Sequence, residues 1–485
     1  MALAPKNKNG FRLVLIGSGI LISCLVLSVI FFSNNQIFPG LIVLIVPFLI
    51  ASLGFIFARP VVGFITLLFA NYFAIGLSRY ISGPLGLSVD GLLILTWLAV
   101  IFSQFNQKLN WKDAWNELTF VAIIWFGYSI FQFFNPEAVS KEAWFYAMRG
   151  ISLYMLLTLP LVFLILNKPK QLHLFLQIWA WLTIIAVLKG IMQKFIGPDP
   201  WEDQWLDAGG GKTHRLAQGL RIFSFFSDSA TYGGSMGFSG VVFSILALYT
   251  NQTKQKIFYL AVGLLAFYAL LISGTRGALA VPFGGFFFYA IISKRFKILL
   301  LIIVMLVGAY SFLKFTTIGE SVYEIRRFRE AVDSDNASLA VRQENQQKFA
   351  AYLTDRPFGG GIGSAGNWGL RFSSGTFLAE TPPDGWYVQI WAEQGIVGLI
   401  LYLSILVFII VRCSYIVMFK LKNKYYIGIA SAFTSGIFGV MVASYSSGAL
   451  GQMPNGIIIY TALAFILMME KWEKNDLIMN EPLSS

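Results

Sequence analysis

The sequence predicts an all-α polytopic membrane protein. Of its 485 residues, 56% are hydrophobic and only 12% are charged, which is more apolar surface than a soluble core needs. Apolar runs such as residues 13–32, 298–313 and 456–469 approach the ~20 residues that a helix needs to cross a bilayer. Because such runs recur along the whole chain, we expect about 12–14 transmembrane helices.

The apolar runs divide the chain into spans and loops. We predict about fourteen spans, at residues 12–33, 40–57, 60–76, 89–105, 118–134, 150–166, 174–193, 234–250, 257–273, 278–293, 298–315, 389–411, 425–446 and 456–470. Two long polar loops lie between them, near residues 194–233 and 316–388. The resulting regions are N-terminal transmembrane helices (1–193), a transmembrane core with the first external loop (194–315), a large external loop (316–388), and C-terminal transmembrane helices with a cytoplasmic tail (389–485).

The distribution of charge predicts the orientation of the spans. With the N-terminus in the cytoplasm, the inner segments carry 19 basic and six acidic residues, whereas 17 basic and 18 acidic residues fall on the outer side or near it. Cytoplasmic loops are enriched in lysine and arginine, so an N-in, C-in topology is expected. Both long loops and the turn "SGTRGA" (residues 273–278) then lie on the outer face.

Residue usage excludes several kinds of site. The only cysteines, Cys24 and Cys413, fall inside apolar runs, and only two histidines occur, so neither a disulfide framework nor a Cys- or His-rich metal centre is expected. The stretch "DAGGGKTHR" (207–215) resembles a phosphate-binding loop, but Leu206 stands where that motif needs its first glycine. We expect His214 to be solvated. We also expect no metal and no cofactor. Nucleic-acid binding is not expected either, because the excess of basic residues follows from membrane orientation.

Arginines stand in the stretches that this topology puts outside. Arg276 is the only charged residue between Lys256 and Lys294, Arg221 lies near the end of the first long loop, and Arg342 lies on a helix expected in the second. Guanidinium groups offer rigid forks of donors that suit a diphosphate. The alternative is that the arginines only extend to the water interface.

Two acids near the second long loop are further candidates. Asp384 precedes Trp386 and Tyr387 where the chain returns to the membrane, and a partly buried carboxylate there could act as a general base. Its alternative role is an N-cap of the following helix, which the residue type alone favours. Glu393 is one of few acids within a predicted span, and its simplest role is a hydrogen bond to a neighbouring helix.

Together these stretches resemble the bacterial O-antigen ligase and polymerase family, membrane glycosyltransferases that also include O-linked oligosaccharyltransferases. The family's Ser-Arg-Gly-like turn corresponds to "SGTRGA", and its arginine-bearing helix with a Pro-x-x-Gly-x-Gly-like turn corresponds to Arg342 and "RPFGGGIGSAG" (356–366). Its His-Asn-x-Tyr-Leu-Gln … Glu-x-Gly-Ile-Ile-Gly segment corresponds to "DGWYVQIWAEQGIVG" (384–398). That pattern falls on Tyr387, Gln389, Glu393, Gly395 and Gly398. The resemblance covers about residues 215–415.

The resemblance implies a metal-independent, inverting enzyme of the bacterial cytoplasmic membrane with its active site on the outer, periplasmic face. Its donor would be an undecaprenyl-diphosphate-linked glycan, its acceptor a glycan or lipid-linked sugar, and its product a surface polysaccharide such as O-antigen, exopolysaccharide or capsule. Arg276, Arg221 and Arg342 would bind the diphosphate, and Asp384 would act as the base. Tyr387, Gln389 and Glu393 would support the site, and membrane lipid would surround it.

One departure from the family pattern bears on the reaction. Asp384 and Gly385 replace the family's usual His-Asn pair, and ligases are expected to use that histidine to activate the acceptor hydroxyl. A carboxylate base is expected more readily in a polysaccharide polymerase, so ligase and polymerase both stay open.

Two functions of other classes are alternatives. A transporter or flippase of lipid-linked glycan usually has ionisable residues near mid-membrane and inverted repeats, whereas the predicted spans here are nearly free of charge and the polar residues lie on one face. A structural partner of such machinery would leave the arginines dispensable.

Overall fold

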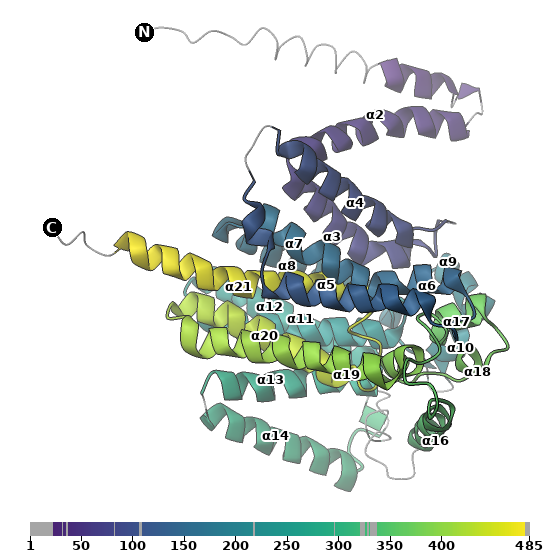
Figure 1. The fold of residues 1–485 in the computed structure, drawn as a ribbon, viewed down its shortest axis with the longest axis vertical. Coiled ribbons are helices and arrows are strands. Elements are labelled where there is room, and N and C mark those ends of the chain that lie inside the picture. Colours follow the sequence, from purple (N-terminus) through teal and green to yellow (C-terminus); the bar gives the residue numbers. More distant parts are fainter. Residues whose placement is uncertain are drawn as a thin grey trace. The chain divides into compact units, whose positions relative to one another are not determined.

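The computed structural model describes residues 23–480, apart from residues 32, 35–36, 82, 106–108, 217–218, 295, 321–324, 327–328 and 330–336 (Figure 1). Much of the predicted span 12–33 therefore lies outside the described residues. The chain forms two compact units. Unit 1 contains residues 1–67 and 91–109, and unit 2 contains residues 68–90 and 110–485.

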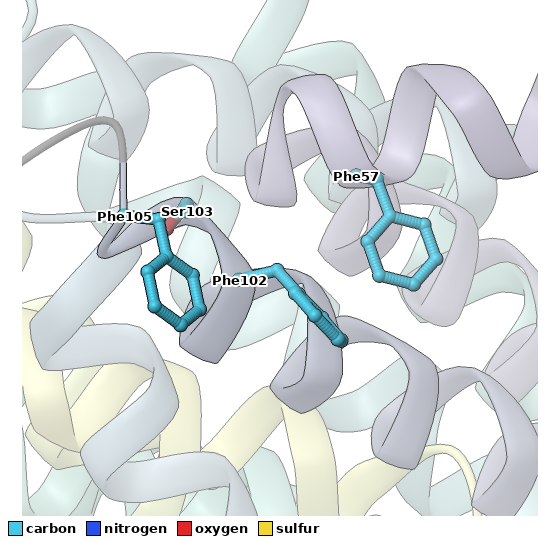
Figure 2. A pocket seen from close by; sticks show the side chains of 4 residues that line it. All are labelled: Phe57, Phe102, Ser103 and Phe105. Atoms are coloured by element: carbon cyan, nitrogen blue, oxygen red, sulfur yellow. The ribbon is translucent and has the colours of Figure 1, made fainter.

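Unit 1 contains α2 (Ile37–Ala58), the first part of α3 (Pro60–Leu77) and most of α4 (Gly86–Ser103). Figure 2 shows an apolar hollow of about 490 Å³ in this unit, lined by Phe57, Phe102, Ser103 and Phe105. The rings of Phe57 and Phe102 meet edge to face with their centroids 5.7 Å apart. Because no charged side chain lines this hollow, it offers no group for the predicted chemistry.

Unit 2 contains the remaining described elements and the other parts of α3 and α4. In chain order they are η1 (Trp111–Ala114), α5 (Glu117–Phe131), η2 (Gln132–Phe134), α6 (Lys141–Met148), η3 (Arg149–Leu153), α7 (Tyr154–Ile165), α8 (Pro169–Phe195), α9 (Pro200–Trp205), η4 (Leu206–Gly210), α10 (Gly211–His214), β1 (Arg215–Leu216), β2 (Gly219–Leu220), α11 (Ser229–Tyr249), α12 (Thr253–Ile272), η5 (Arg276–Leu279), α13 (Ala280–Ile292), α14 (Phe296–Phe315), α16 (Ala337–Tyr352), α17 (Gly366–Phe372), α18 (Phe377–Glu380), α19 (Trp386–Tyr415), η6 (Ile416–Lys420), α20 (Lys424–Ala443) and α21 (Asn455–Asn480).

The fold class predicted from the sequence is confirmed. Among the described residues, ten helical segments are long and apolar enough to cross a membrane, and Arg276–Ile292 is a shorter apolar helix. The apolar helices α2 and α14 have 22 and 20 residues. The only described strands, β1 and β2, pair as one antiparallel hairpin. The protein is therefore an all-α polytopic membrane protein.

Several helices begin earlier than the predicted spans. The segment Lys141–Ile165 is one continuous apolar helix, although the predicted span begins at residue 150. The side chain of Ser140 accepts a hydrogen bond from the N–H of Ala143 and caps this helix. Similarly, α19 begins at Trp386, three residues before the predicted span. Hydropathy predicts where a chain enters the membrane, and a helix can begin outside it.

Helix α11 forms much of the core of unit 2, and 89% of its membrane-length window is buried. Small residues allow close packing around it. A Cβ added to Gly237 would lie 2.8 Å from Leu270 of α12, and one added to Gly240 would lie 2.5 Å from Phe267. Tight packing of α11 against α12 therefore fixes the position of the turn that follows α12.

The short helices of both long loops gather at one end of unit 2. Figure 1 shows α9, α10, α16, α17 and α18 at the same end, which we call the loop end, whereas the C-terminal end of α21 lies at the opposite end. The two loops are therefore on one side of the helices, as the charge distribution predicts.

Candidate functional site

The turn "SGTRGA" lies at the loop end between two apolar helices. Helix α12 ends at Ile272, and Gly274 adopts the left-handed conformation with a φ of 62°, which glycine tolerates without strain. Buried Ser273 donates a hydrogen bond from Oγ to the carbonyl oxygen of Leu270, 2.7 Å away. Arg276 then begins η5 and is half-buried. Arg276 therefore lies at a helix end and not in the middle of a span.

Arg221 reaches this turn from the first long loop. Its Nη2 donates a hydrogen bond to Oγ1 of Thr275 at 3.0 Å, and its Nη1 donates to the carbonyl oxygen of Thr213 at 3.2 Å. Thr275 directly precedes Arg276, so the two predicted diphosphate-binding arginines belong to one group of contacts. This hydrogen bond joins two residues that lie more than fifty positions apart in the sequence.

The uncharged loop between α20 and α21 (residues 444–454) contacts two glycines of the predicted site. A Cβ added to Gly277 would lie 2.3 Å from Oγ of Ser446, and one added to Gly385 would lie 2.1 Å from the carbonyl oxygen of Tyr445. The backbone carbonyl leaves no room for a side chain at position 385, and a side chain at position 277 would require the serine hydroxyl to move. Two neighbouring residues of one loop therefore pack against both glycines.

These glycines place the arginine turn and the candidate base against the same loop. Arg276 directly precedes Gly277, and Asp384 directly precedes Gly385. Both residues are thus one position away from a glycine that rests on the 444–454 loop. The same packing explains part of the departure from the family pattern, because an asparagine side chain at position 385 would meet the carbonyl of Tyr445.

Asp384 is not the N-cap of α19, so that alternative is wrong. The N-cap is Gly385, which has no side chain, and Asp384 lies one residue before it. Its half-buried carboxylate accepts a hydrogen bond at Oδ2 from Nδ2 of Asn345, 3.1 Å away. Asn345 is only 6% exposed. The carboxylate is therefore held by a side chain from the second long loop.

Arg342 lies on the same helix as that asparagine. Helix α16 contains both residues, three positions apart, which places them on one face. The predicted helix in the second long loop is present, and Phe349 on α16 packs in a buried cluster with Val388 and Ala392 of α19. Arg342, half-buried, is thus one helical turn from the partner of Asp384.

Helix α19 is kinked where the glycine-rich turn meets it. Gly395 has φ 66° and ψ −171°, which only glycine adopts readily. A Cβ there would lie 2.0 Å from the carbonyl oxygen of Pro357. A Cβ on Gly359, whose φ is 71°, would lie 2.4 Å from the N atom of Gly395. The backbone of the kink therefore packs directly against the backbone of the turn, with no side chain between them.

Backbone hydrogen bonds join the turn to the kink. They run from Gly360 N to Ala392 O (3.0 Å), from Gly361 N to Glu393 O (2.8 Å) and from Val397 N to Pro357 O (3.2 Å). The kink frees helical carbonyl and N–H groups, and the turn satisfies them. These bonds thus tie the large external loop to the part of α19 that lies about two to three helical turns after Asp384.

The carboxylate of Glu393 is fully buried beside this junction. Its Oε1 accepts a hydrogen bond from Nε2 of Gln389 at 3.2 Å, one turn earlier on the same helix. The backbone N–H groups of Gly363 and Ala365 also face the carboxylate. The expected partner on a neighbouring helix is therefore wrong, and Glu393 instead links its own helix to the glycine-rich turn.

Tyr387 ties the beginning of α19 to α20. Its hydroxyl donates a hydrogen bond to the carbonyl oxygen of Met441 at 2.7 Å. The preceding residue, Trp386, is buried and donates from Nε1 to the hydroxyl of Tyr402 at 2.9 Å. These bonds fix the backbone that follows Asp384.

His214 is buried, so the expectation of a solvated side chain is wrong. It is 3% exposed and packs against the rings of Trp205 and Phe223, with centroids 5.2 and 5.0 Å away. Its Nδ1 lies 2.8 Å from the carbonyl oxygen of Gly210. Burial lowers the pKa of His214 below its ordinary value. The histidine is a packing residue beneath the hairpin that leads to Arg221.

Several residues of this arrangement escaped the sequence analysis. Arg79 lies over the rings of Trp205 and Phe223, 4.5 and 4.4 Å from their centroids, and supports the first long loop from the turn after α3. Asn345 and Ser446 are common polar residues that belong to no motif. Asn345 alone had a usable signal, since it stands three positions after Arg342 on a predicted helix.

The charges of the candidate site come from three arginines and one aspartate. No group of three or more His, Cys, Asp or Glu side chains that could hold a metal ion occurs in the part of the chain that the structure describes. Guanidinium groups beside a single carboxylate suit an anionic ligand and a proton acceptor.

Comparison with known sequences agrees with this arrangement. Residues 261–403 match the family model described as O-antigen ligase. The matched segment contains "SGTRGA", α16, the glycine-rich turn and the beginning of α19. No curated protein matches the chain. The resemblance of the chain to the O-antigen ligase and polymerase family is therefore confirmed over residues 261–403.

Proposed function

We propose that the protein transfers or polymerises a glycan from an undecaprenyl-diphosphate donor onto a sugar hydroxyl at the outer face of the bacterial cytoplasmic membrane. The product would be a surface polysaccharide. The family match supports glycan transfer of the O-antigen ligase or polymerase type. The sharper proposal rests on one observation, the convergence of the arginine turn, Arg221, α16 and Asp384 on the loop end of unit 2.

Arg276 and Arg221, with Arg342, would bind the diphosphate. A diphosphate diester carries two negative charges, and guanidinium groups can bind its oxygens in a bidentate manner. As the bond to the sugar breaks, negative charge grows on the leaving oxygen, so preorganised arginines stabilise the transition state more than the ground state. The same charges would make a metal ion unnecessary.

Asp384 would accept the proton of the acceptor. The acceptor oxygen attacks the anomeric carbon, a new glycosidic bond forms, and the bond from that carbon to the diphosphate oxygen breaks. The proton of the hydroxyl passes to the carboxylate, and undecaprenyl diphosphate leaves with both bonding electrons. Attack opposite the leaving group inverts the anomeric centre. Asn345 would keep the carboxylate oriented by donating to Oδ2.

The test compares Arg276→Ala with Arg215→Ala in purified protein. Arg215 is a matched control because it lies on the first long loop but is exposed and paired with Asp203 and Asp207. We expect Arg276→Ala to slow glycan transfer about 10²–10³-fold, the usual effect of removing one oxyanion-stabilising donor. Arg215→Ala should keep most of the activity. Equal rates for wild type and Arg276→Ala would refute the proposed role.

The assay in detergent micelles also separates the enzyme from its alternatives. A micelle has no compartments, so a transporter or a structural partner would form no glycosidic bond from purified donor and acceptor. Product length then distinguishes the two enzymatic activities. A ladder of repeat units on the lipid carrier indicates a polymerase, and a single transfer to a separate acceptor, releasing the carrier, indicates a ligase.

A further inference from the structure

A second polar hollow lies at the end of unit 2 opposite the candidate site. It has a volume of about 640 Å³ and is formed by η1, the beginning of α5, the α7–α8 turn, the later part of α19 and α21. Arg412, which lines it, stands 26 residues after Trp386 on α19. At 1.5 Å per residue this is roughly 39 Å along the helix, about the thickness of a membrane.

The polar wall of this hollow has more cations than it can pair internally. Arg412 forms ion pairs with Glu117 and with Glu470, and Lys471 pairs with Asp113. The three lining acids are therefore satisfied. Lys112 and Lys168 also line the hollow, and neither forms an ion pair with any residue that the structure describes. The hollow thus presents two exposed ammonium groups to an anion.

The other wall is apolar and reaches toward the membrane. Phe163, near the end of α7, and Leu467 and Met468, in the middle of α21, line it. Trp115 stands at its edge and is 73% exposed. Buried Trp472 completes this wall and donates from Nε1 to the carbonyl oxygen of Asn167 at 2.9 Å. Tryptophans are common at the boundary between acyl chains and head groups.

We propose that this hollow binds an anionic phospholipid of the leaflet opposite the candidate site. The phosphate would lie between Lys112 and Lys168, and the first part of an acyl chain would lie along the apolar wall. Basic pockets between transmembrane helices recognise anionic head groups in this way. A soluble phosphate compound would use the lysines equally well but would gain nothing from the exposed ring of Trp115. The combination of both walls therefore favours lipid, and it does not depend on the proposed glycan transfer.

The experiment titrates the purified full-length protein in dodecylmaltoside micelles with dioleoylphosphatidylglycerol, dioleoylphosphatidylcholine or inorganic phosphate. Thermal unfolding and native mass spectrometry measure binding. We expect phosphatidylglycerol to stabilise and remain bound to the wild type, and phosphatidylcholine to do so much less. The double variant Lys112→Gln, Lys168→Gln should lose roughly tenfold or more in affinity for phosphatidylglycerol.

Two controls sharpen the result. Lys254→Gln with Lys256→Gln removes two exposed lysines near the beginning of α12 that do not line the hollow, and this variant should bind as the wild type does. Trp115→Ala should weaken binding of phosphatidylglycerol. Equal affinity of the two double variants, or equal affinity of wild type for the two lipids, would overturn the proposal. Phosphate that binds as tightly as phosphatidylglycerol, unaffected by Trp115→Ala, would assign the site to a soluble anion instead.

Discussion

Replacing Gly395 by alanine should detach the large external loop from α19 without unfolding the membrane helices. The new Cβ would lie 2.0 Å from the carbonyl oxygen of Pro357 and 2.5 Å from the N atom of Gly359. These contacts are backbone atoms and cannot rotate away. The glycine-only φ and ψ add strain of about 1–3 kcal/mol for any other residue. The chain relieves both effects when the 357–363 turn and the kink of α19 separate.

The magnitude follows from the bonds that this movement breaks. Three backbone hydrogen bonds join the turn to the kink, and each contributes about 0.5–1.5 kcal/mol. With the strain, the local free energy of opening should fall by about 2.5–7.5 kcal/mol. Since 1.4 kcal/mol is a factor of ten, amide hydrogen exchange at Gly360 and Gly361 should accelerate at least about 60-fold.

Hydrogen–deuterium exchange with mass spectrometry measures this effect in the purified protein. Gly127→Ala on α5 is the matched control, because a Cβ there has nothing within 4 Å. The control should leave exchange of residues 357–363 unchanged, and peptides from α11 should stay protected in both variants. Protection of Gly360 and Gly361 in Gly395→Ala at the wild-type level would refute the reasoning that the bare glycine backbone holds this junction.

The other predictions concern the candidate site and its support. Asp384→Asn keeps the side chain's size but removes the base, so the rate of transfer should fall about 10²–10⁴-fold with donor affinity retained; near-wild-type initial rates would contradict the role. A double-mutant cycle of Arg221→Ala and Thr275→Ala should give a coupling free energy of about 0.5–1.5 kcal/mol in kcat/KM. Additive effects of the two substitutions would show that this hydrogen bond does not contribute to catalysis. Because burial lowers the pKa of His214, protonation favours the unfolded chain; its contribution to stability is complete above about pH 6.5 and is lost as the pH falls toward the lowered pKa. His214→Gln should therefore show a smaller decrease in Tm between pH 7 and pH 5 than the wild type, and parallel decreases would contradict this.

The spans were predictable because hydropathy depends on residue type alone. Apolar runs and loop charges identify which segments cross the membrane and which loops share a face. They do not report where a helix begins in water, so the polar first turn of Lys141–Ile165 was missed. The kink at Gly395 was missed for another reason. A glycine within an apolar run is common in membrane helices, and its conformation here is set by Pro357, nearly forty residues earlier.

The candidate site was predictable in its residue types and not in its contacts. Arginines and an aspartate in outer segments are visible in the sequence because charge is rare in this chain. The contacts that gather them use a threonine hydroxyl, an asparagine amide, glycines and backbone carbonyls. Such groups occur in every segment, so no pattern selects Ser446, and only its spacing from Arg342 points to Asn345. Likewise, the N-cap expected of Asp384 depended on a helix boundary that differs by one residue.

The position of Arg276 at a helix end explains how a charge can be both tolerable and effective in so apolar a chain. At the centre of a span, Arg276 would cost roughly 2.5 kcal/mol or more in desolvation, with no phosphate within reach. In open water its attraction for a diphosphate would be weak, because the interaction of two unit charges 4 Å apart falls from ~4 kcal/mol at an effective dielectric constant of 20 to ~1 kcal/mol in bulk water. Half-burial between α12 and α13, beside the hydroxyl of Thr275 that orients Arg221, avoids both extremes. The same reasoning applies to Asp384, whose carboxylate is half-buried and held by one amide. A boundary site of this kind favours a ligand whose charged diphosphate stays at the interface while its lipid remains in the membrane.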